Sequence, residues 1–182
     1  MALEEDASVE TQEVAIASGL TPDDVEQVLS MAAASGLFSS SEMTSAESMA
    51  WDSAYGNGNE PDTFLKATIN RAGKDQVIGF ICFGPIPYWP GNYEMYAIAV
   101  DPEFQRLGIG SALINEMNRL VDYDNGQSIF FETKTDRAFE NARLFCEANN
   151  FIPEHRHIKQ FIPEGGGIVY RYDLGSDTDE LN

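Results

Sequence analysis

Residues 100–117 read VDPEFQRLGIGSALINEM, and the expected fold depends on this stretch. An apolar, β-prone run ends at Val100, directly before an Asp-Pro pair. Apolar residues at helical spacing then predict an amphipathic helix over residues 108–122. Glycine destabilises a helix by roughly 1 kcal/mol relative to alanine, so Gly108 and Gly110 at its start require an explanation. They serve either a turn with close backbone packing or the approach of an anion to the main chain.

Helices and strands are expected to alternate on both sides of this stretch. Thr21, followed by a proline and two aspartates, is typical of a helix start. Residues 84–91 contain three prolines and are expected not to continue a strand ladder. The expected helices cover residues 22–37, 42–55, 108–122 and 136–149, and the expected strands cover residues 13–17, 63–70, 76–83, 92–100, 127–133, 154–161 and 168–173. The core-facing residues expected on the helix 108–122 are Ile109, Ala112, Leu113, Met117, Leu120 and Val121. This order predicts an α/β (α+β layered) domain with a mixed sheet and helices on both faces.

The composition is that of an acidic globular protein. The chain has 182 residues, and we expect one domain over residues 11–174 between acidic, mobile ends at 1–10 and 175–182. The formal net charge of −19, from 30 acidic and 11 basic residues, argues against nucleic-acid binding and favours the approach of cations. No apolar run approaches the roughly 18 residues of a membrane helix, and the N-terminal residues lack a secretory h-region. Cys82 and Cys146 match no metal-binding spacing and are expected to be reduced thiols of a cytoplasmic protein.

The glycine-containing turn is open to three interpretations. In the first, the glycines only allow close packing. In the second, Gly108-x-Gly110 opens a dinucleotide-binding fingerprint with Glu132 near the place of its ribose-binding acid, although Leu113 replaces the third glycine. In the third, the helix N-terminus offers unpaired N–H groups to a pyrophosphate, and Arg106 adds a cation. A P-loop is excluded because no Gly-Lys-Ser/Thr sequence follows.

Residues 105–110, QRLGIG, resemble the Q/R-x-x-G-x-G/A signature of the GNAT family of N-acetyltransferases. The neighbouring segments are similar to that family in the same order. YEMYAIAVDPEFQ (93–105) resembles its fourth strand and SIFFETKTD (128–136) its fifth. ARLFCEANNF (142–151) resembles the end of the helix that follows, and IKQFIPEGGGIVYRYDL (158–174) the closing hairpin of one bacterial branch.

This resemblance, which covers about residues 63–174, implies a fold and a cofactor. The fold is a mixed, mostly antiparallel sheet of about six or seven strands, with helices on both faces and a splay between the fourth and fifth strands. The family transfers an acetyl group from acetyl-CoA to an amine without a metal. Its signature amides hold the CoA pyrophosphate, a role that falls by position to Gln105, Arg106, Leu107, Gly108, Ile109, Gly110 and Ser111. The pantetheine arm pairs with the strand edge that matches Ile98, Ala99 and Val100, and the Ile98 N–H would polarise the thioester carbonyl.

Glu94 occupies the position of the catalytic glutamate in the histone-acetylating branch of the family, four residues before Ile98. An amine with a pKa near 10.4 is mostly protonated at pH 7, and a general base removes its proton best when the base has a pKa near the working pH. Among Tyr93, Met95 and Tyr96, desolvation would raise the pKa of Glu94. The alternative is a solvated glutamate that faces outward from its strand.

Cys146 stands where many family members have a tyrosine that protonates the leaving thiolate. A thiol with a pKa near 8.5 can donate a proton, and the alternative role is that of a small buried apolar residue. Another branch of the family has an asparagine where this chain has Phe139. Asn141 is therefore the candidate for that cofactor contact.

The acceptor site is expected opposite the cofactor, near the first helices and the loop 84–91. Tyr88 and Trp89 in this loop are candidates to bind a cationic acceptor with their ring faces, or they only pack within the loop. His155 and His157 share one strand face but lack a third ligand, so no metal site is expected.

The resemblance and these residues predict an acetyl-CoA-dependent N-acetyltransferase that passes the acetyl group directly to a small-molecule or peptide amine in a ternary complex. The missing tyrosine motivates an alternative, a non-catalytic acyl-CoA-binding or regulatory module on the same fold. A dinucleotide-dependent oxidoreductase is the third interpretation. No nucleic-acid or membrane partner is expected, and a homodimer is left open because the family often forms dimers.

Overall fold

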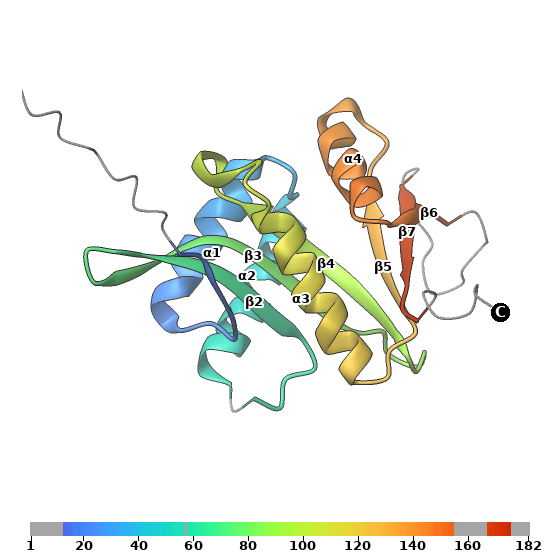
Figure 1. Cartoon of the computed structure of the whole chain (residues 1–182), viewed down its shortest axis with the longest axis horizontal. Helices are drawn as coiled ribbons and strands as arrows, with labels where there is room; N and C mark the ends of the chain where they lie inside the picture. The colour runs from blue at the N-terminus through green and yellow to red at the C-terminus, as the bar shows by residue number, and fades with distance from the viewer. Residues whose placement is uncertain (1–12, 57, 155–166, 176–182) are drawn as a thin grey trace, which may run out of the picture.

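Seven strands form one mixed sheet. The strands are β1 (Ala15–Ser18), β2 (Thr63–Arg71), β3 (Lys74–Pro85), β4 (Asn92–Val100), β5 (Ser128–Thr133), β6 (Ile152–Pro153) and β7 (Ile168–Asp173). They lie in the order β1-β2-β3-β4-β5-β7-β6 in a computed structural model that describes residues 13–56, 58–154 and 167–175 (Figure 1). Within these ranges β4 and β5 pair in parallel, and the other neighbours pair antiparallel. The expected mixed, mostly antiparallel sheet is confirmed.

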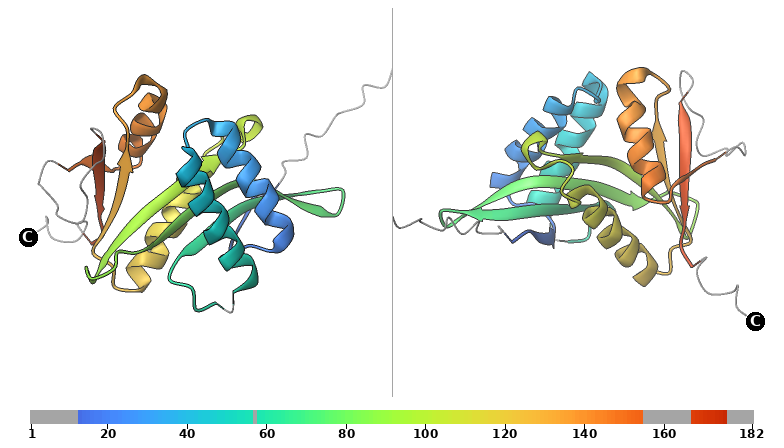
Figure 2. Two further views of the ribbon diagram at one scale, coloured as in Figure 1. Left: turned by 180° about the vertical axis from the view of Figure 1, so that it is seen from behind. Right: turned by 45° about the horizontal axis from the view of Figure 1, so that its top comes forward.

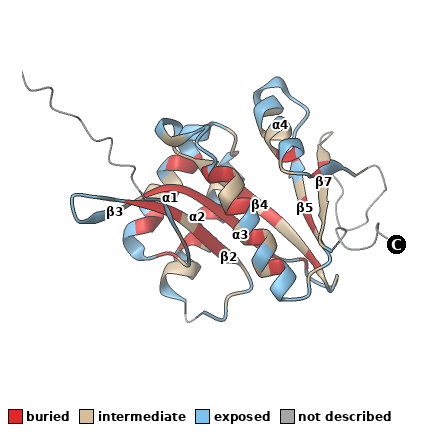
Figure 3. Cartoon of the chain, viewed as in Figure 1, coloured by how far each residue is buried: buried red, intermediate tan, exposed pale blue. Residues whose placement is uncertain are grey.

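Helices cover both faces of this sheet. They are α1 (Pro22–Ser35), α2 (Ser40–Tyr55), α3 (Ile109–Tyr123) and α4 (Glu140–Ala148), with short 3-10 turns η1 (Pro102–Phe104) and η2 (Arg137–Phe139). Figure 2 shows α1 and α2 on one face and α3 on the other. The buried side chains form a separate cluster under each layer, and Cys146 of α4 belongs to the cluster under α3. In Figure 3 the buried residues follow the central strands between the two helical layers.

A buried carboxylate ties α1 to the sheet. Asp24, in the first turn of α1, is 6% exposed. It accepts hydrogen bonds from the Thr21 N–H (2.7 Å), the Thr21 hydroxyl (2.8 Å) and Lys66 Nζ on β2 (2.5 Å). Burial alone would raise the pKa of Asp24, but these bonds and the Lys66 charge outweigh it and lower the pKa. The helix start predicted at Thr21 is therefore also an attachment to β2.

The expected end of β3 was wrong. The strand continues through Pro85, although the prolines after it were expected to stop the ladder. Pro85 pairs with Tyr93 on β4, and β3 has no pairing partner on its β2 side beyond Phe83. The next N–H, at Ile86, donates to Asn92 O on β4 (2.9 Å), so alternation directs the backbone nitrogen of Pro85 toward the open side. The missing N–H therefore removes no ladder hydrogen bond.

Helix boundaries also differ from the expectation. The helix expected over 136–149 is divided into η2 and α4. α2 begins earlier than expected because Ser39 and Glu42 form a capping box, with the Ser39 N–H donating to Glu42 Oε2 (2.6 Å) and the Glu42 N–H to Ser39 Oγ (3.3 Å). On α3, Ile114 is buried at 1% exposure, whereas Ala112 is only half-buried.

Some expectations fall outside the described residues. These are the acidic N-terminal stretch 1–10, most of the tail 175–182, most of the strand expected over 154–161, and both His155 and His157. In the described part, β7 pairs on its outer side with the short strand β6.

The strands β4 and β5 part after three residue pairs. Their pairing ends with Glu94 opposite Phe130, while β4 stays paired with β3 as far as Val100. The register between β3 and β4 shifts at Tyr96, which makes this residue a β-bulge on β4. Figure 1 shows β4 and β5 diverging toward the end of the sheet where α3 begins. The expected splay between the fourth and fifth strands is confirmed.

Candidate active site

The splay leaves one edge of β4 without a neighbouring strand. The Asp101 N–H donates to Ile78 O on β3 (2.9 Å), so alternation turns the N–H groups of Ile98 and Val100 away from β3. On this open side, Val100 O accepts a hydrogen bond from Gln105 Nε2 (3.0 Å). The edge at Ile98 therefore offers main-chain hydrogen-bonding groups to an extended ligand.

The first turn of α3 also presents main-chain donors. Its N-cap, Gly108, supplies no side-chain cap, and the first main-chain bond runs from the Ala112 N–H to Gly108 O (2.9 Å). Within the described residues, no acceptor bonds the N–H groups of Ile109, Gly110 and Ser111. The positive end of the helix dipole lies at the same place, so this turn suits a phosphate.

Gly108 is required by the backbone of the turn. Its φ of 83° lies in the left-handed region, as does the φ of 64° at Arg106. An ideal Cβ on Gly108 would meet no atom within 4 Å, so the space beside the turn is open. Arg106 and Leu107 are exposed next to it. The geometry fits the interpretation that an anion approaches the main chain here.

Glycine is required at position 110 for a different structural reason. A Cβ on Gly110 would lie 2.9 Å from Phe145 Cζ on α4 and 3.7 Å from Val100 Cγ2. The glycine therefore allows α3 and α4 to approach each other closely. Close packing thus accounts for Gly110, whereas the open turn at Gly108 leaves space for an anion.

Glu94 lies at the last pairing position before β4 and β5 separate, opposite Gly84 on β3 and Phe130 on β5. Burial raises the pKa of Glu94 to about 7, and the negative charges of Glu132 and Asp62 act in the same direction. This carboxyl group can exchange a proton near neutral pH, as a general base must. The burial argues against the alternative of a fully solvated glutamate.

Asp62 and Tyr96 meet above Gly84, beside Glu94. The Tyr96 hydroxyl donates a hydrogen bond to the Asp62 carboxylate. An ideal Cβ on Gly84 would collide with Asp62 Oδ1 and lie 3.2 Å from Tyr96 Oη. Burial raises the pKa of Asp62, and the charge of Asp52 raises it further. Glycine at this position therefore makes room for the carboxylate and the phenol.

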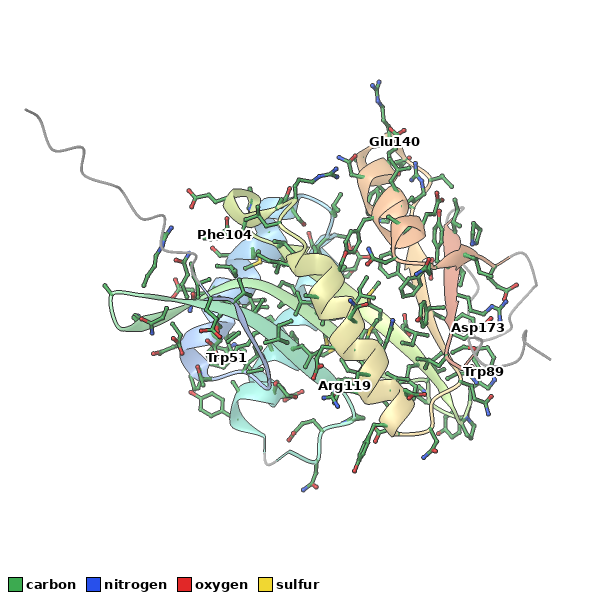
Figure 4. All side chains as sticks on the ribbon, viewed as in Figure 1. Trp51, Trp89, Phe104, Arg119, Glu140 and Asp173 are labelled. Carbon is green, nitrogen blue, oxygen red and sulfur yellow. The ribbon has the colours of Figure 1, made fainter. Side chains whose placement is uncertain are left out.

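A pocket of about 440 Å³ opens next to Asp62, between α2 and the segment before β2. The rings of Trp51 and Tyr55 stack in its wall with their centroids 5.5 Å apart, and they are 38% and 74% exposed. Asp52 and Glu60 line the same pocket, and Figure 4 shows Trp51 in the layer of α1 and α2. Exposed ring faces beside carboxylates favour a cationic ligand.

Cys146 lies on the buried face of α4. It is 1% exposed, and burial, with a smaller effect of the Glu147 charge, raises the pKa of its thiol to about 12. Such a thiol is a poor proton donor to a thiolate whose own pKa is near 8.5. The structure thus favours the packing role for Cys146. Asn141, the other candidate on α4, is exposed.

Trp89 packs on Phe130, the residue of β5 that pairs with Glu94, whereas Tyr88 in the same loop makes no such contact. The Trp89 ring stacks on Phe130, 5.0 Å between centroids, and Tyr88 is fully exposed. Figure 4 shows Trp89 at the opposite end of the sheet from Phe104, which precedes α3. The structure favours the packing role for Trp89 and assigns Tyr88 no contact in the site.

Two residues beside Glu94 were not predicted to be site residues, although Tyr96 was expected to help desolvate Glu94. Tyr96 follows Glu94 at a spacing of two, and strand alternation alone would have placed both side chains on one face. Asp62 carries no such local signal. Asp62 reaches the site because β2 begins opposite Phe83. This pairing joins distant parts of the chain, and a short sequence pattern cannot predict it.

In the described ranges, no helix is both long enough and apolar enough to span a membrane. The same residues contain no group of His, Cys, Asp and Glu side chains placed to hold a metal ion. Cys82 and Cys146 are both buried free thiols.

Comparison with known proteins gives a family match over most of the chain. The sequence model of the Acetyltransferase (GNAT) family matches residues 31–151, which include the parted strands and all of α3. A search of curated proteins found no match.

This chain matches three solved structures of the same architecture over nearly the whole length of each. A protein from Desulfovibrio desulfuricans described as a GNAT-family acetyltransferase is 27% identical, with a TM-score of 0.77 over 89% of this chain and 99% of that one. The PaiA N-acetyltransferase from Thermoplasma acidophilum, solved in complex with coenzyme A, is 18% identical, with a TM-score of 0.67 over 88% and 99%. The ribosomal-protein-S18-alanine N-acetyltransferase from Escherichia coli is 18% identical, with a TM-score of 0.62 over 93% and 99%. The latter two support the fold alone.

Proposed function

This chain belongs to the GNAT family of acetyltransferases, and from that premise we propose that it transfers an acetyl group from acetyl-CoA to a primary amine. The observation that carries the proposal is the position of the uncapped first turn of α3 beside the unpaired edge of β4. A diphosphate fits the first turn of α3, and an extended arm that contains amides fits the edge of β4. Coenzyme A contains both groups. We assign this activity to one domain over residues 11–174.

The cofactor would lie between β4 and β5. The N–H groups of Gly108, Ile109, Gly110 and Ser111 would bind its pyrophosphate, with Arg106 as an exposed cation beside them. Ile98, Ala99 and Val100 would pair with the pantetheine arm, and the Ile98 N–H would donate to the thioester oxygen as it becomes negative. Gln105 already bonds Val100 O, and its contribution would be to hold the turn against the strand end.

Glu94 would act as the general base. Its carboxylate would accept a proton from the bound ammonium group, and the neutral nitrogen would attack the thioester carbon. The new N–C bond forms and the C–S bond breaks, so that coenzyme A leaves as a thiolate, and the second amine proton passes to this thiolate through solvent. The pKa of Glu94, raised to about 7, narrows the gap to the pKa of the amine and supports this role.

The acceptor would approach from the α2 side. Asp62, Glu94 and Glu132 give this side of the splay a negative potential, and the pocket with Trp51 and Tyr55 adjoins it. Such a surface attracts cations, which supports an acceptor that is an amine.

A thiol-release assay tests the proposal. Purified protein, acetyl-CoA and a panel of small amines and peptide N-termini are combined, and free CoA is measured with a thiol reagent. Release that depends on the amine and stops with Glu94→Gln is the expected result. Absence of release with every amine, despite calorimetric binding of acetyl-CoA, would instead favour a non-catalytic acyl-CoA-binding module, the alternative that buried Cys146 in place of a tyrosine supports.

A further inference from the structure

Three groups that can ionise converge on one glycine from two separate segments. Asp62 comes from the segment before β2, whereas Glu94 and Tyr96 lie on β4. Gly84 pairs directly with Glu94, and a side chain on Gly84 would collide with the Asp62 carboxylate and crowd the Tyr96 hydroxyl. The space next to Glu94 that a side chain at position 84 would occupy is therefore occupied by the carboxylate of Asp62.

Tyr96 lies two residues after Glu94, so strand alternation turns it to the same face as Glu94, where Asp62 also lies. Cys82 on β3 pairs with Ala97, and Phe83 pairs with Met95, so Tyr96 is the extra residue between them. Tyr96 and Ala97 both contact the cluster under α1 and α2, because a bulge can turn two consecutive side chains to one face. The bulge thus turns Ala97 to the face that Tyr96 already occupies.

The charge of Asp62 is not neutralised by the described part of the chain. No Lys, Arg or His within it forms an ion pair with Asp62 or Glu94. The charged groups that act on Glu94 are Glu132 from β5 and Asp62, and those that act on Asp62 include Asp52 from α2. Cys82 on β3 lies near Asp62 as a buried thiol whose pKa is raised by burial and by that charge.

We propose that Asp62 is a positioning residue for acetyl transfer: the Tyr96 hydroxyl holds its carboxylate over Gly84, where its negative charge adds to burial and to the charge of Glu132 in making Glu94 a stronger base. This role rests on the proposed function of Glu94. The phenol supplies the fixed geometry, since it stays protonated and remains a donor throughout the working pH range. Without the carboxylate, Glu94 would ionise at lower pH and become a weaker base.

The test is an NMR titration of the Glu94 carboxyl carbon in carbon-13-labelled protein, assigned by its loss in Glu94→Gln. Asp62→Asn keeps the volume and the acceptor for Tyr96 but removes the charge. We expect it to lower the titration midpoint by roughly half to one pH unit, the size of a like-charge interaction at about 4 Å that is screened as strongly as in water. Tyr96→Phe, which frees Asp62 to turn toward solvent, should lower the midpoint by a smaller amount.

Asp52→Asn is the matched control, because it removes one charge from the neighbouring pocket without acting on Glu94 directly. It should leave the midpoint unchanged. The acid limb of the pH–rate profile should move with the midpoint in Asp62→Asn, while the KM for acetyl-CoA stays constant. Thermal unfolding and acetyl-CoA binding confirm that each variant is folded.

The titration needs no turnover, so the two proposals can fail separately. An unshifted midpoint in Asp62→Asn, with an active wild-type enzyme, overturns the role of Asp62 and leaves the proposed function standing. A wild-type protein that binds acetyl-CoA but acetylates no amine overturns the proposed function, and the role of Asp62 in transfer falls with it.

Discussion

The ring of Phe145 fills the space that a side chain at position 110 would need, since an ideal Cβ on Gly110 would lie 2.9 Å from Phe145 Cζ. This contact joins α3, which packs on β2, β3 and β4, to α4, which follows β5. The second glycine of the QRLGIG segment thus determines how closely the elements on the two sides of the splay approach each other.

Replacing Gly110 with alanine should destabilise the protein only while the Phe145 ring is present. Alanine favours the helix by up to about 1 kcal/mol, whereas crowding a packed side chain costs about 1–3 kcal/mol. We expect Gly110→Ala to lower the free energy of unfolding in urea, and to leave it unchanged or raise it in a Phe145→Leu background. An equal effect in both backgrounds would contradict the packing role.

Gly108→Ala should weaken cofactor binding as well as stability. Its Cβ would meet no atom, so the expected cost is that of a left-handed alanine, roughly 1–2 kcal/mol. Relief of this strain would turn the first N–H groups of α3 away from the pyrophosphate, and we expect acetyl-CoA affinity to fall about tenfold, or about 1.4 kcal/mol, by calorimetry.

Gly36→Ala provides the control for this substitution. Gly36 has a φ of 67° with equally open space around it, at the C-terminus of α1. It should lose similar stability and keep its affinity for acetyl-CoA. Equal affinities of the two variants would refute a role for the Gly108 turn in binding.

Glu94→Gln should stabilise the protein at alkaline pH while it abolishes most activity. The pKa of Glu94 is raised to about 7 in the fold, against about 4.3 for an ordinary glutamate, so its ionisation opposes folding as the pH rises through this interval. The substitution should raise the free energy of unfolding at pH 8 by at most roughly 4 kcal/mol, a limit that solvent screening reduces, and by less at pH 5. Acetyl transfer should fall roughly 10²- to 10⁴-fold. Lower stability at pH 8 would show that the raised pKa is wrong.

Asp24 should contribute stability that acid removes. Its pKa is lowered in the fold, so the contribution is present above the unfolded value of about 3.9 and is lost as the pH falls through the folded value. Asp24→Asn leaves Lys66 without its carboxylate and should cost about 1–3 kcal/mol at pH 7, measured by urea denaturation, with the difference disappearing in acid. Asp23→Asn, at the exposed neighbouring position, should change stability by about 0.5 kcal/mol or less. A penalty that persists in acid would exclude the ionic explanation.

Local patterns in the sequence were sufficient for much of the fold. The strand that ends at Val100, the turn at Gly108 and the helix that begins at Ile109 follow from alternation, glycine conformation and helical spacing, and the structure has all three. The splay was expected from the resemblance to the GNAT family rather than from any spacing, and it is confirmed at the pair of Glu94 and Phe130.

Features that depend on distant parts of the chain were not predicted. Pro85 remains in β3 because β2 begins only opposite Phe83 and leaves Pro85 without a partner on that side, which the prolines alone do not reveal. Trp89 packs against Phe130 because β5 lies beside β4, and Asp62 reaches Glu94 through the pairing of β2 with β3. The cofactor side of the candidate site is local in sequence, whereas the acceptor side is assembled by tertiary contacts.

The most direct measurement is an NMR titration of nitrogen-15-labelled protein with coenzyme A. The amide resonances of residues 108–111 should shift downfield as their N–H groups bind the pyrophosphate, and the amides of Ile98 and Val100 should become protected from exchange with solvent. Coenzyme A that binds without changing these amides, or that fails to bind at millimolar concentration, would contradict the assignment of the splay and the α3 turn as the cofactor site.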